Sequence, residues 1–112
     1  MKATVSLKGN YAFRRLYSKG KNTVRPALVL YCRRNGSQEN RLGITVSTKL
    51  GKAVKRNLIR RRLREIYRLH EDEIRRGYDF VVVARSLSAE YSYSALEADF
   101  LKAAERLNVL VS

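Results

Sequence analysis

A short amphipathic helix is predicted near the N-terminus, over about residues 10–19. Its apolar side chains recur at helical spacing, at Phe13, Leu16 and Tyr17. Asn10 can cap the start of this helix, and Gly20 is a typical left-handed residue after a helix end. We therefore expect the helix to pack one apolar side against the rest of the protein.

After the single proline, the period of apolar positions changes from helical to alternating, which indicates strands. Residues 28–33 alternate between two faces, and so do residues 42–47, with a polar turn between them. Residues 27–48 therefore predict a β-hairpin, and a further short strand near residues 22–25 is left open. Five consecutive apolar residues within 79–85 predict a third strand at the centre of the sheet.

Two longer helices complete the pattern. One is predicted over residues 52–69, where Ile59, Leu63 and Ile66 fall within an arc of about 60° that should face the core. The last helix begins after Ser92 or Ser94, either of which can cap it. Its apolar stripe consists of Leu96, Phe100, Ala103, Leu107 and Leu110.

The predicted order is helix, strand, strand, helix, strand, helix, and 112 residues fit a single domain over 1–112. The fold class is α+β, an α/β sandwich whose helices cover one face of the sheet. The opposite face would carry a mixture of side chains that is unlike a core. These side chains are Val29, Tyr31, Arg33, Gly43 and Thr45. We expect a ligand on this open face.

Charge indicates the class of ligand. Lys and Arg number 24 against 10 Asp and Glu, a formal net charge of +14 that favours a polyanionic partner. The hydrophobic content of 45% excludes a disordered basic tail, and one cysteine excludes an internal disulfide. No segment resembles a signal peptide or a membrane span, so we expect a cytoplasmic protein. A helix on a membrane surface would need a broad face of large apolar residues opposite its cations.

More than half of the net charge lies in one predicted helix and the residues before it. Nine basic residues and one acid, Glu65, occupy residues 49–68. One side of the helix would carry Arg60, Arg64, Asn57, Arg68 and Arg61. A solvated charged surface is the ordinary alternative, but like charges at this spacing repel each other and only Glu65 offsets them. Because arginine forks suit phosphate oxygens, we interpret this side as a contact with nucleic acid.

Aromatic residues indicate single-stranded nucleic acid. Phe13 and Tyr17 lie one turn apart on the first helix, and Tyr31 points to the open face of the sheet. Exposed aromatic rings beside cations stack on unpaired bases. For Phe13, anchoring its helix to the sheet is an equally good interpretation.

The chain offers no catalytic set. A two-histidine nuclease is excluded because His70 is the only histidine, and the one acidic cluster, residues 71–73, lies in an expected connection. Gly51 and Lys52 lack the remainder of a phosphate loop, and Cys32 is expected to be a buried hydrophobe. We predict neither a catalytic residue nor a metal ligand in this chain.

Residues 47–65, STKLGKAVKRNLIRRRLRE, resemble the signature of the bacterial ribonuclease P protein family. Residues 13–20, 28–31, 41–43 and 78–83 also match, so the resemblance covers nearly the whole chain. Many family members have two lysines after the serine of the signature, where this chain has Thr48 before Lys49.

The resemblance implies that a ribonuclease P RNA removes the 5′ leader of precursor tRNA with Mg²⁺ held mainly by RNA and substrate, while the protein assists binding. It also implies a ribosomal protein S5 domain 2-like fold, with a left-handed crossover against the usual right-handed rule. The implied contacts with the catalytic RNA are Lys52, Arg56, Asn57, Arg60, Arg61, Arg64 and, from the helical wheel, Arg68. The implied cleft for the leader comprises Phe13, Tyr17 and Tyr31, with Arg33 on the same open face. Neither a membrane nor an obligate protein partner is implied.

Two other classes explain part of the pattern. A stand-alone RNA-binding or ribosome-assembly protein would account for the charge and the aromatic residues without tRNA processing. A DNA-binding protein could place the arginine helix in a major groove, but that helix is also expected to pack on the sheet. Stacking on unpaired bases favours a single strand over duplex DNA.

Overall fold

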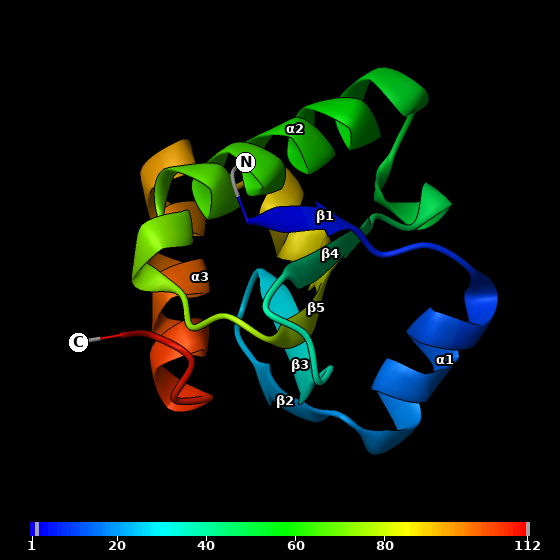
Figure 1. The fold of residues 1–112 in the computed structure, drawn as a ribbon. Coiled ribbons are helices and arrows are strands. Elements are labelled where there is room, and N and C mark those ends of the chain that lie inside the picture. The colour runs from blue at the N-terminus through cyan, green and yellow to red at the C-terminus, as the bar shows by residue number, and fades with distance from the viewer. Residues whose placement is uncertain (2, 112) are drawn as a thin grey trace.

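The computed structural model describes residue 1 and residues 3–111 as a five-stranded mixed sheet with helices on both faces (Figure 1). The strands are β1 (Thr4–Ser6), β2 (Lys21–Val24), β3 (Leu28–Arg34), β4 (Asn40–Thr45) and β5 (Tyr78–Ala84). The helices are α1 (Asn10–Lys19), α2 (Ala53–Leu69) and α3 (Tyr93–Arg106). None of the helices in the described residues has the length and apolar composition that a bilayer crossing requires.

Strand β5 lies at the centre of the sheet, as its apolar run predicts, in the order β1-β4-β5-β3-β2. It pairs antiparallel with β3 and parallel with β4. The predicted hairpin over 27–48 is therefore wrong, because β5 lies between its two strands. A strand with apolar side chains on both faces is buried best between two neighbours, and this outweighs the short connection from β3 to β4.

Two features at the edges of the sheet complete it. Strand β2 forms an antiparallel hairpin with β3, which confirms the further strand near residues 22–25. Strand β1 was not predicted, since three residues are too few to show a period, and it pairs parallel with β4. The parallel neighbours β4 and β5 are joined through α2, and the left-handedness of this crossover stays a prediction.

The larger core lies between the sheet and the pair α2 and α3. The predicted inward side chains of β3 and α2 are all buried there, which confirms their assignment: Leu28, Leu30, Cys32, Ile59, Leu63 and Ile66. Burial raises the pKa of the Cys32 thiol, although the charge of Lys21 opposes this. Cys32 therefore packs as a small hydrophobe rather than serving as a nucleophile.

Helix α1 packs on the other face of the sheet, so the prediction that all helices cover one face is wrong (Figure 1). Leu16 of α1 is buried there with Val81 of β5 and with Leu7. The reason lies in β5, whose Val81 and Val83 are apolar on this second face and need a cover. The face predicted to be open is thus partly closed by α1.

The ends of α1 differ from the prediction. Gly9 precedes the helix and Asn10 is its first residue, with no side-chain cap. Gly20 is extended rather than left-handed, with φ −80°. A Cβ at Gly20 would lie 2.6 Å from the carbonyl oxygen of Leu16 and 2.9 Å from that of Cys32. Close approach of two backbones, not helix termination, accounts for this glycine.

Helix α3 begins as one of the two alternatives predicted. Ser92 is its N-cap, and its hydroxyl accepts a hydrogen bond of 3.1 Å from the backbone N–H of Ala95. Ser94 lies inside the helix. The cap satisfies one of the N–H groups that a helix start leaves without a partner.

Buried polar side chains fix α2 to the sheet. The amide of Asn40 donates to the hydroxyl of Tyr67 at 3.2 Å and to the carbonyl of Arg75 at 3.0 Å, and its oxygen accepts from the N–H of Tyr78 at 2.9 Å. Thr4 on β1 forms a further hydrogen bond with Tyr67 at 2.9 Å. These bonds set where α2 lies across β1 and β4.

His70 joins the end of α2 to α3. Its Nδ1 lies 2.6 Å from Glu73 and its Nε2 lies 2.8 Å from Glu97, and its side chain is 18% exposed. A neutral imidazole can donate only one of these two bonds. Burial, the largest influence, lowers the pKa of His70, but the hydrogen bonds and charges of Glu97 and Glu73 together outweigh it and raise that pKa.

The His70 contacts predict a pH-dependent stability. The pKa of His70 is raised above its unfolded value of about 6.5, so the protonated ring contributes its full stabilisation of the fold below about pH 6.5. This stabilisation is lost as the pH rises through the folded-state pKa. His70→Gln should lower the free energy of unfolding by about 1 kcal/mol near pH 6 and by much less near pH 9. Urea unfolding at a series of pH values measures this. A difference between wild type and variant that does not change with pH would contradict it.

Candidate nucleic-acid interface

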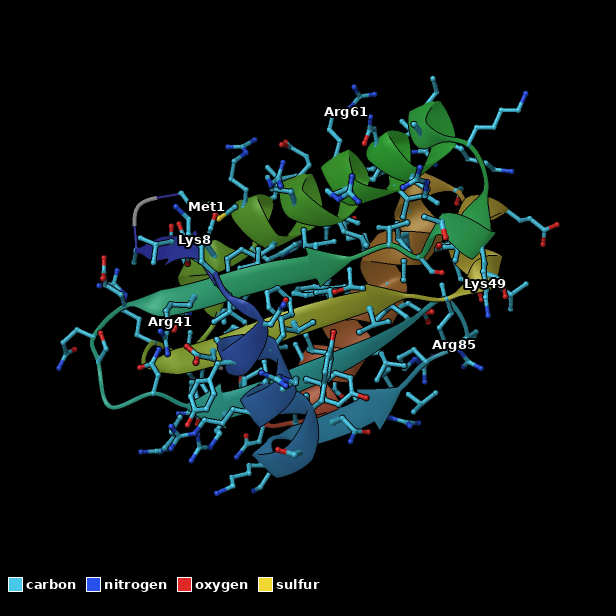
Figure 2. The ribbon with its side chains drawn as sticks, turned by 90° about the vertical axis from the view of Figure 1, so that its right-hand side faces the viewer. Met1, Lys8, Arg41, Lys49, Arg61 and Arg85 are labelled. Atoms are coloured by element: carbon cyan, nitrogen blue, oxygen red, sulfur yellow. The ribbon has the colours of Figure 1, made fainter. Side chains whose placement is uncertain are left out.

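The side of α2 that faces away from the core carries the predicted RNA contacts. Ile59, Leu63 and Ile66 are buried, so the positions opposite them point outward. The seven predicted residues divide between half-buried Arg56 and Arg60 and the exposed Lys52, Asn57, Arg61, Arg64 and Arg68. Figure 2 shows the side chain of Arg61 extending from α2 away from the sheet.

Short-range contacts orient two of these arginines. Asn57 accepts a hydrogen bond of 2.9 Å from the guanidinium of Arg60, one turn further along α2. Arg56 donates from Nε to the carbonyl of Gly51 at 3.2 Å, just before the helix. Both contacts leave other guanidinium N–H groups available, because arginine has five donors in a planar fork. Asn57 thus positions a cation.

Arg68 differs from the other six predicted residues. Its Nε and one terminal nitrogen lie 3.0 and 2.6 Å from the carboxylate of Glu65. The hydrogen bond from Arg68 lowers the pKa of Glu65, so the carboxylate is charged at neutral pH. An exposed pair of this kind adds little stability, but it offsets the charge of Arg68. The unpaired positive charge lies towards the N-terminal half of α2.

The three predicted aromatic residues gather on the other face of the sheet. The rings of Tyr17 and Tyr31 meet edge to face with centroids 4.9 Å apart, and Phe13 lies 6.4 Å from Tyr17. The hydroxyl of Tyr17 is 3.3 Å from that of Thr45 on β4. Tyr17 is 39% exposed, so part of its ring is open to a ligand. We call Phe13, Tyr17 and Tyr31 the aromatic cluster.

Phe13 also holds α1 on the sheet. A Cβ at Gly43 would lie 2.6 Å from Cζ of Phe13, so the ring occupies the space that the missing side chain leaves. Phe13 is half-buried and packs with the cluster of Leu7, Leu16 and Val81. The anchoring interpretation of Phe13 is therefore supported by the structure.

Arg33 lies apart from the aromatic cluster. It lines a hollow of about 340 Å³ together with Ala12 and Leu16, whereas Phe13 and Tyr17 do not line it. At 100° per residue, Ala12 and Leu16 point to one flank of α1, and Phe13 and Tyr17 point roughly 100° away. Helix α1 thus separates the four residues predicted for one cleft into two groups.

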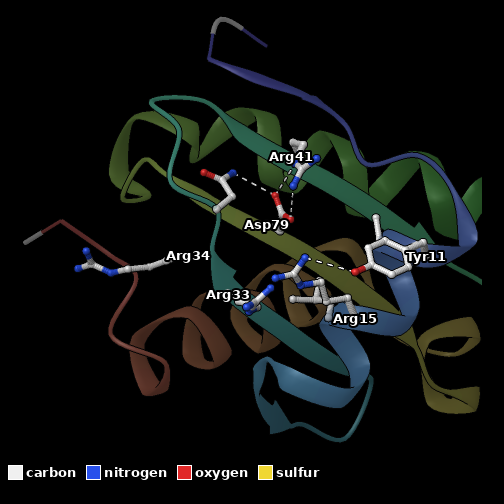
Figure 3. Close-up of a pocket in the computed structure, with 9 residues that line it drawn as sticks. Tyr11, Arg15, Arg33, Arg34, Arg41 and Asp79 are labelled. Atoms are coloured by element: carbon white, nitrogen blue, oxygen red, sulfur yellow. Dashed lines mark hydrogen bonds and ion pairs between the residues drawn. The ribbon is translucent and has the colours of Figure 1, made fainter.

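The hollow contains cations that were not among the predicted site residues. Arg15 of α1 and Arg41 of β4 line it beside Arg33, and Arg41 is bonded to Asp79 through two contacts of 2.7 Å (Figure 3). Alternation along β4 places Arg41 on the same face as Gly43, so this signal was present in the sequence. The position of Arg15 required knowing which sheet face α1 covers.

Comparison with known proteins identifies the family. The ribonuclease P family profile matches residues 1–108. The chain belongs to the ribonuclease P protein family. A ribonuclease P protein component from Alkaliphilus oremlandii is 38% identical over all of this chain and 98% of its own length. One from Clostridioides difficile is 38% identical over 96% of each. As a member of this family, the chain is a subunit of the endoribonuclease ribonuclease P.

Solved structures of ribonuclease P proteins share the fold. The protein from Staphylococcus aureus is 31% identical, with a TM-score of 0.87 over 97% of this chain and 98% of that one. The protein from Thermotoga maritima is 33% identical, with a TM-score of 0.83 over 90% of this chain and 96% of that one. The α+β class predicted from the sequence is thereby confirmed, together with the resemblance on which it partly rests.

The contact between Phe13 and Gly43 predicts the effect of a single methyl group. Gly43→Ala should lower the free energy of unfolding by about 1–3 kcal/mol, because the new Cβ occupies the place of the ring edge. Phe13→Leu in the same chain should recover part of the loss, so the two changes should be less than additive in thermal unfolding. Full additivity would show that α1 does not rest on Gly43.

Proposed function

We propose that this ribonuclease P subunit binds the catalytic RNA through the outward side of α2 and the single-stranded 5′ leader of precursor tRNA through the aromatic cluster. In this way it assists the RNA-catalysed removal of the leader in the cytoplasm. The observation that carries the proposal is the arginine side of α2, where Arg68 alone among the seven predicted residues has a carboxylate partner within the described part of the chain.

The arginine side of α2 fits an RNA backbone. Arg60, Arg61 and Arg64 repel one another at helical spacing, and phosphates placed among them would relieve this repulsion. Arg60 is held by Asn57 and needs little ordering when it binds. The packed aliphatic side of α2 gives the arginines a rigid base, so the charges keep their spacing when RNA is bound.

The aromatic cluster fits unpaired bases. Edge-to-face contact with Tyr17 holds the ring of Tyr31 in place, and Tyr31 is half-exposed on the sheet surface. A base stacks on such a ring whatever its identity, at roughly 1–3 kcal/mol per base. A leader that lacks secondary structure would therefore be bound with little sequence preference, while duplex RNA would not reach the rings.

The chemistry of leader removal is assigned to the RNA. Across residue 1 and residues 3–111, no three His, Cys, Asp or Glu side chains gather as a metal site requires. We therefore propose no step through a metal held by the protein. The Mg²⁺ ions implied by the family are proposed to lie on the RNA and its substrate.

Reconstitution tests this function. Precursor tRNA would be incubated at low Mg²⁺ with the protein, with a bacterial ribonuclease P RNA, or with both, after host RNA has been stripped from the protein. We expect cleavage at the mature 5′ end to be strong only in the combination. No gain over the RNA alone would indicate a stand-alone RNA-binding protein, and strong cleavage by the protein alone would refute the assignment of catalysis to RNA.

Removing charge from α2 should weaken assembly with the catalytic RNA. Arg60→Ala with Arg64→Ala removes two proposed phosphate contacts, which should lower the slope of log affinity against log salt by about 1.4–1.8. Filter binding at a series of salt concentrations measures this slope. Lys102→Ala with Arg106→Ala removes the same charge from α3 and is the matched control. Equal slopes for the two double variants would refute the role of α2.

Removing the ring of Tyr31 should affect substrates that carry a leader. Tyr31→Ala should reduce the preference of the holoenzyme for precursor over mature tRNA by about tenfold, the loss of one stacked base. Tyr31→Phe keeps the ring and should behave as wild type, since the hydroxyl forms no hydrogen bond within the described residues. An equal loss of affinity for both tRNAs would indicate a folding defect instead.

A further inference from the structure

A basic hollow lies on the flank of α1 opposite the aromatic cluster. Its volume is about 340 Å³, and its walls come from α1, from the end of β3 and from the start of β4 and β5. Four arginines and a single acid, Asp79, line it, which leaves three positive charges in excess. The arginines are Arg15, Arg33, Arg34 and Arg41. We call this hollow the arginine pocket.

The one acid in the pocket is fully engaged. Asp79 accepts from Nε and a terminal nitrogen of Arg41, both at 2.7 Å, and from the amide of Asn35 at 3.0 Å. Its side chain is 15% exposed, and it fixes the guanidinium of Arg41 in one plane at the wall of the pocket (Figure 3). Asp79 therefore orients a cation and is not available to neutralise the other arginines.

The remaining arginines lack an anion. Arg33 is half-buried and has no hydrogen bond or ion pair within the described residues. Arg15 donates only a long bond of 3.5 Å to the hydroxyl of Tyr11, whose ring lies 6.0 Å from its guanidinium carbon. Arg34 lies at the rim over the ring of Tyr78 and points away from the others (Figure 3). Arg33 is thus a half-buried cation without a counter-charge, with the exposed Arg15 beside it, and this arrangement favours binding of an anion.

A cationic path connects the pocket with the aromatic cluster. The outer surface of α1 carries Arg14, Ser18 and Lys19 beside Arg15, and α1 contains no acid. Leu16 packs against Val81 beneath α1, so an RNA strand cannot pass between the helix and the sheet. An RNA strand that extends from Tyr17 would cross this outer surface, where basic side chains line its path to the pocket.

We infer that the arginine pocket binds a phosphate group of the RNA strand whose bases stack on the aromatic cluster. The inference rests on the proposed function and extends it, because it gives Arg33 a role apart from the leader cleft. Arg15, Arg33 and Arg41, on three elements, line a space large enough for one phosphate, and the planar forks of Arg15 and Arg33 are not held by a carboxylate within the described residues. The phosphate is either an internal phosphodiester of the leader or the group at its 5′ end.

The test is the affinity of reconstituted holoenzyme for precursor tRNAs with leaders of one to about ten nucleotides. For wild type, affinity should rise with leader length in two steps, one for the aromatic cluster and one for the pocket. Arg33→Ala should lose only the second step, by about tenfold, and should lower the salt slope for long leaders by about 0.7. Arg33→Lys should restore the slope but not the full affinity, because it keeps the charge and loses the fork. Arg106→Ala on α3 is the matched control and should follow wild type.

The outcomes separate this inference from the proposed function. No dependence on leader length in wild type would refute the proposed function itself. If Arg33→Ala gives the same curve as wild type, the role of the pocket is refuted while the proposed function stands. If Arg33→Ala loses as much affinity for mature tRNA as for precursor tRNA, Arg33 acts in folding. Leaders ending in 5′-triphosphate or 5′-hydroxyl distinguish the two sources of phosphate. If the second step occurs at one leader length and only with the 5′-triphosphate, the pocket binds the terminal group. If the second step occurs with both kinds of 5′ end, the pocket binds an internal phosphodiester.

Discussion

The fold depends on a central strand that is apolar on both faces. In β5, Phe80 and Val82 face α2 and α3, whereas Val81 and Val83 face α1. Water must be excluded from both faces, so the short chain has to supply helices on each side of a single sheet. As a result the arginines of α2 and the aromatic rings of α1 lie on opposite faces. The two surfaces proposed to contact RNA therefore do not overlap.

Three acidic side chains hold elements of the fold together. Asp99 is buried and accepts from the N–H of Ala27 at 2.9 Å and from Arg25 at 3.2 Å, which fastens the turn between β2 and β3 to α3. Asp79 and Glu97 are likewise committed to Arg41 and His70. These three carboxylates are paired with cations within the fold, and the 24 basic residues far outnumber the 10 acids, for a net charge of +14. A bound polyanion would neutralise this excess of positive charge.

The sequence predicts local structure here better than it predicts pairing. Helical spacing places α1 over residues 10–19, and five apolar residues identify β5 as central, because both signals are local. The partner of β3 is decided by competition between β4 and β5, which no local pattern contains. Similarly, the amphipathic pattern of α1 shows that Leu16 is buried but not which face of the sheet buries it. The i,i+4 spacing places Phe13 and Tyr17 together on α1, and strand alternation places Tyr31 on the second face of the sheet. Their meeting depends on the face that α1 covers, and the arginine pocket depends in addition on the register of three strands.

That register places three rows of side chains across β3, β5 and β4, and each row has its own chemistry. Arg33, Asp79 and Arg41 form an ionic row, Tyr31, Val81 and Gly43 the next, and Val29, Val83 and Thr45 the third. Helix α1 rests on the middle row because Gly43 is the one position there without a side chain, and the ring of Phe13 fills the space. A larger residue would clash with this ring, so the ring or the helix would have to move. Gly43 therefore helps to set the position of α1, which lies between the cationic flank and the aromatic flank and leaves part of each exposed.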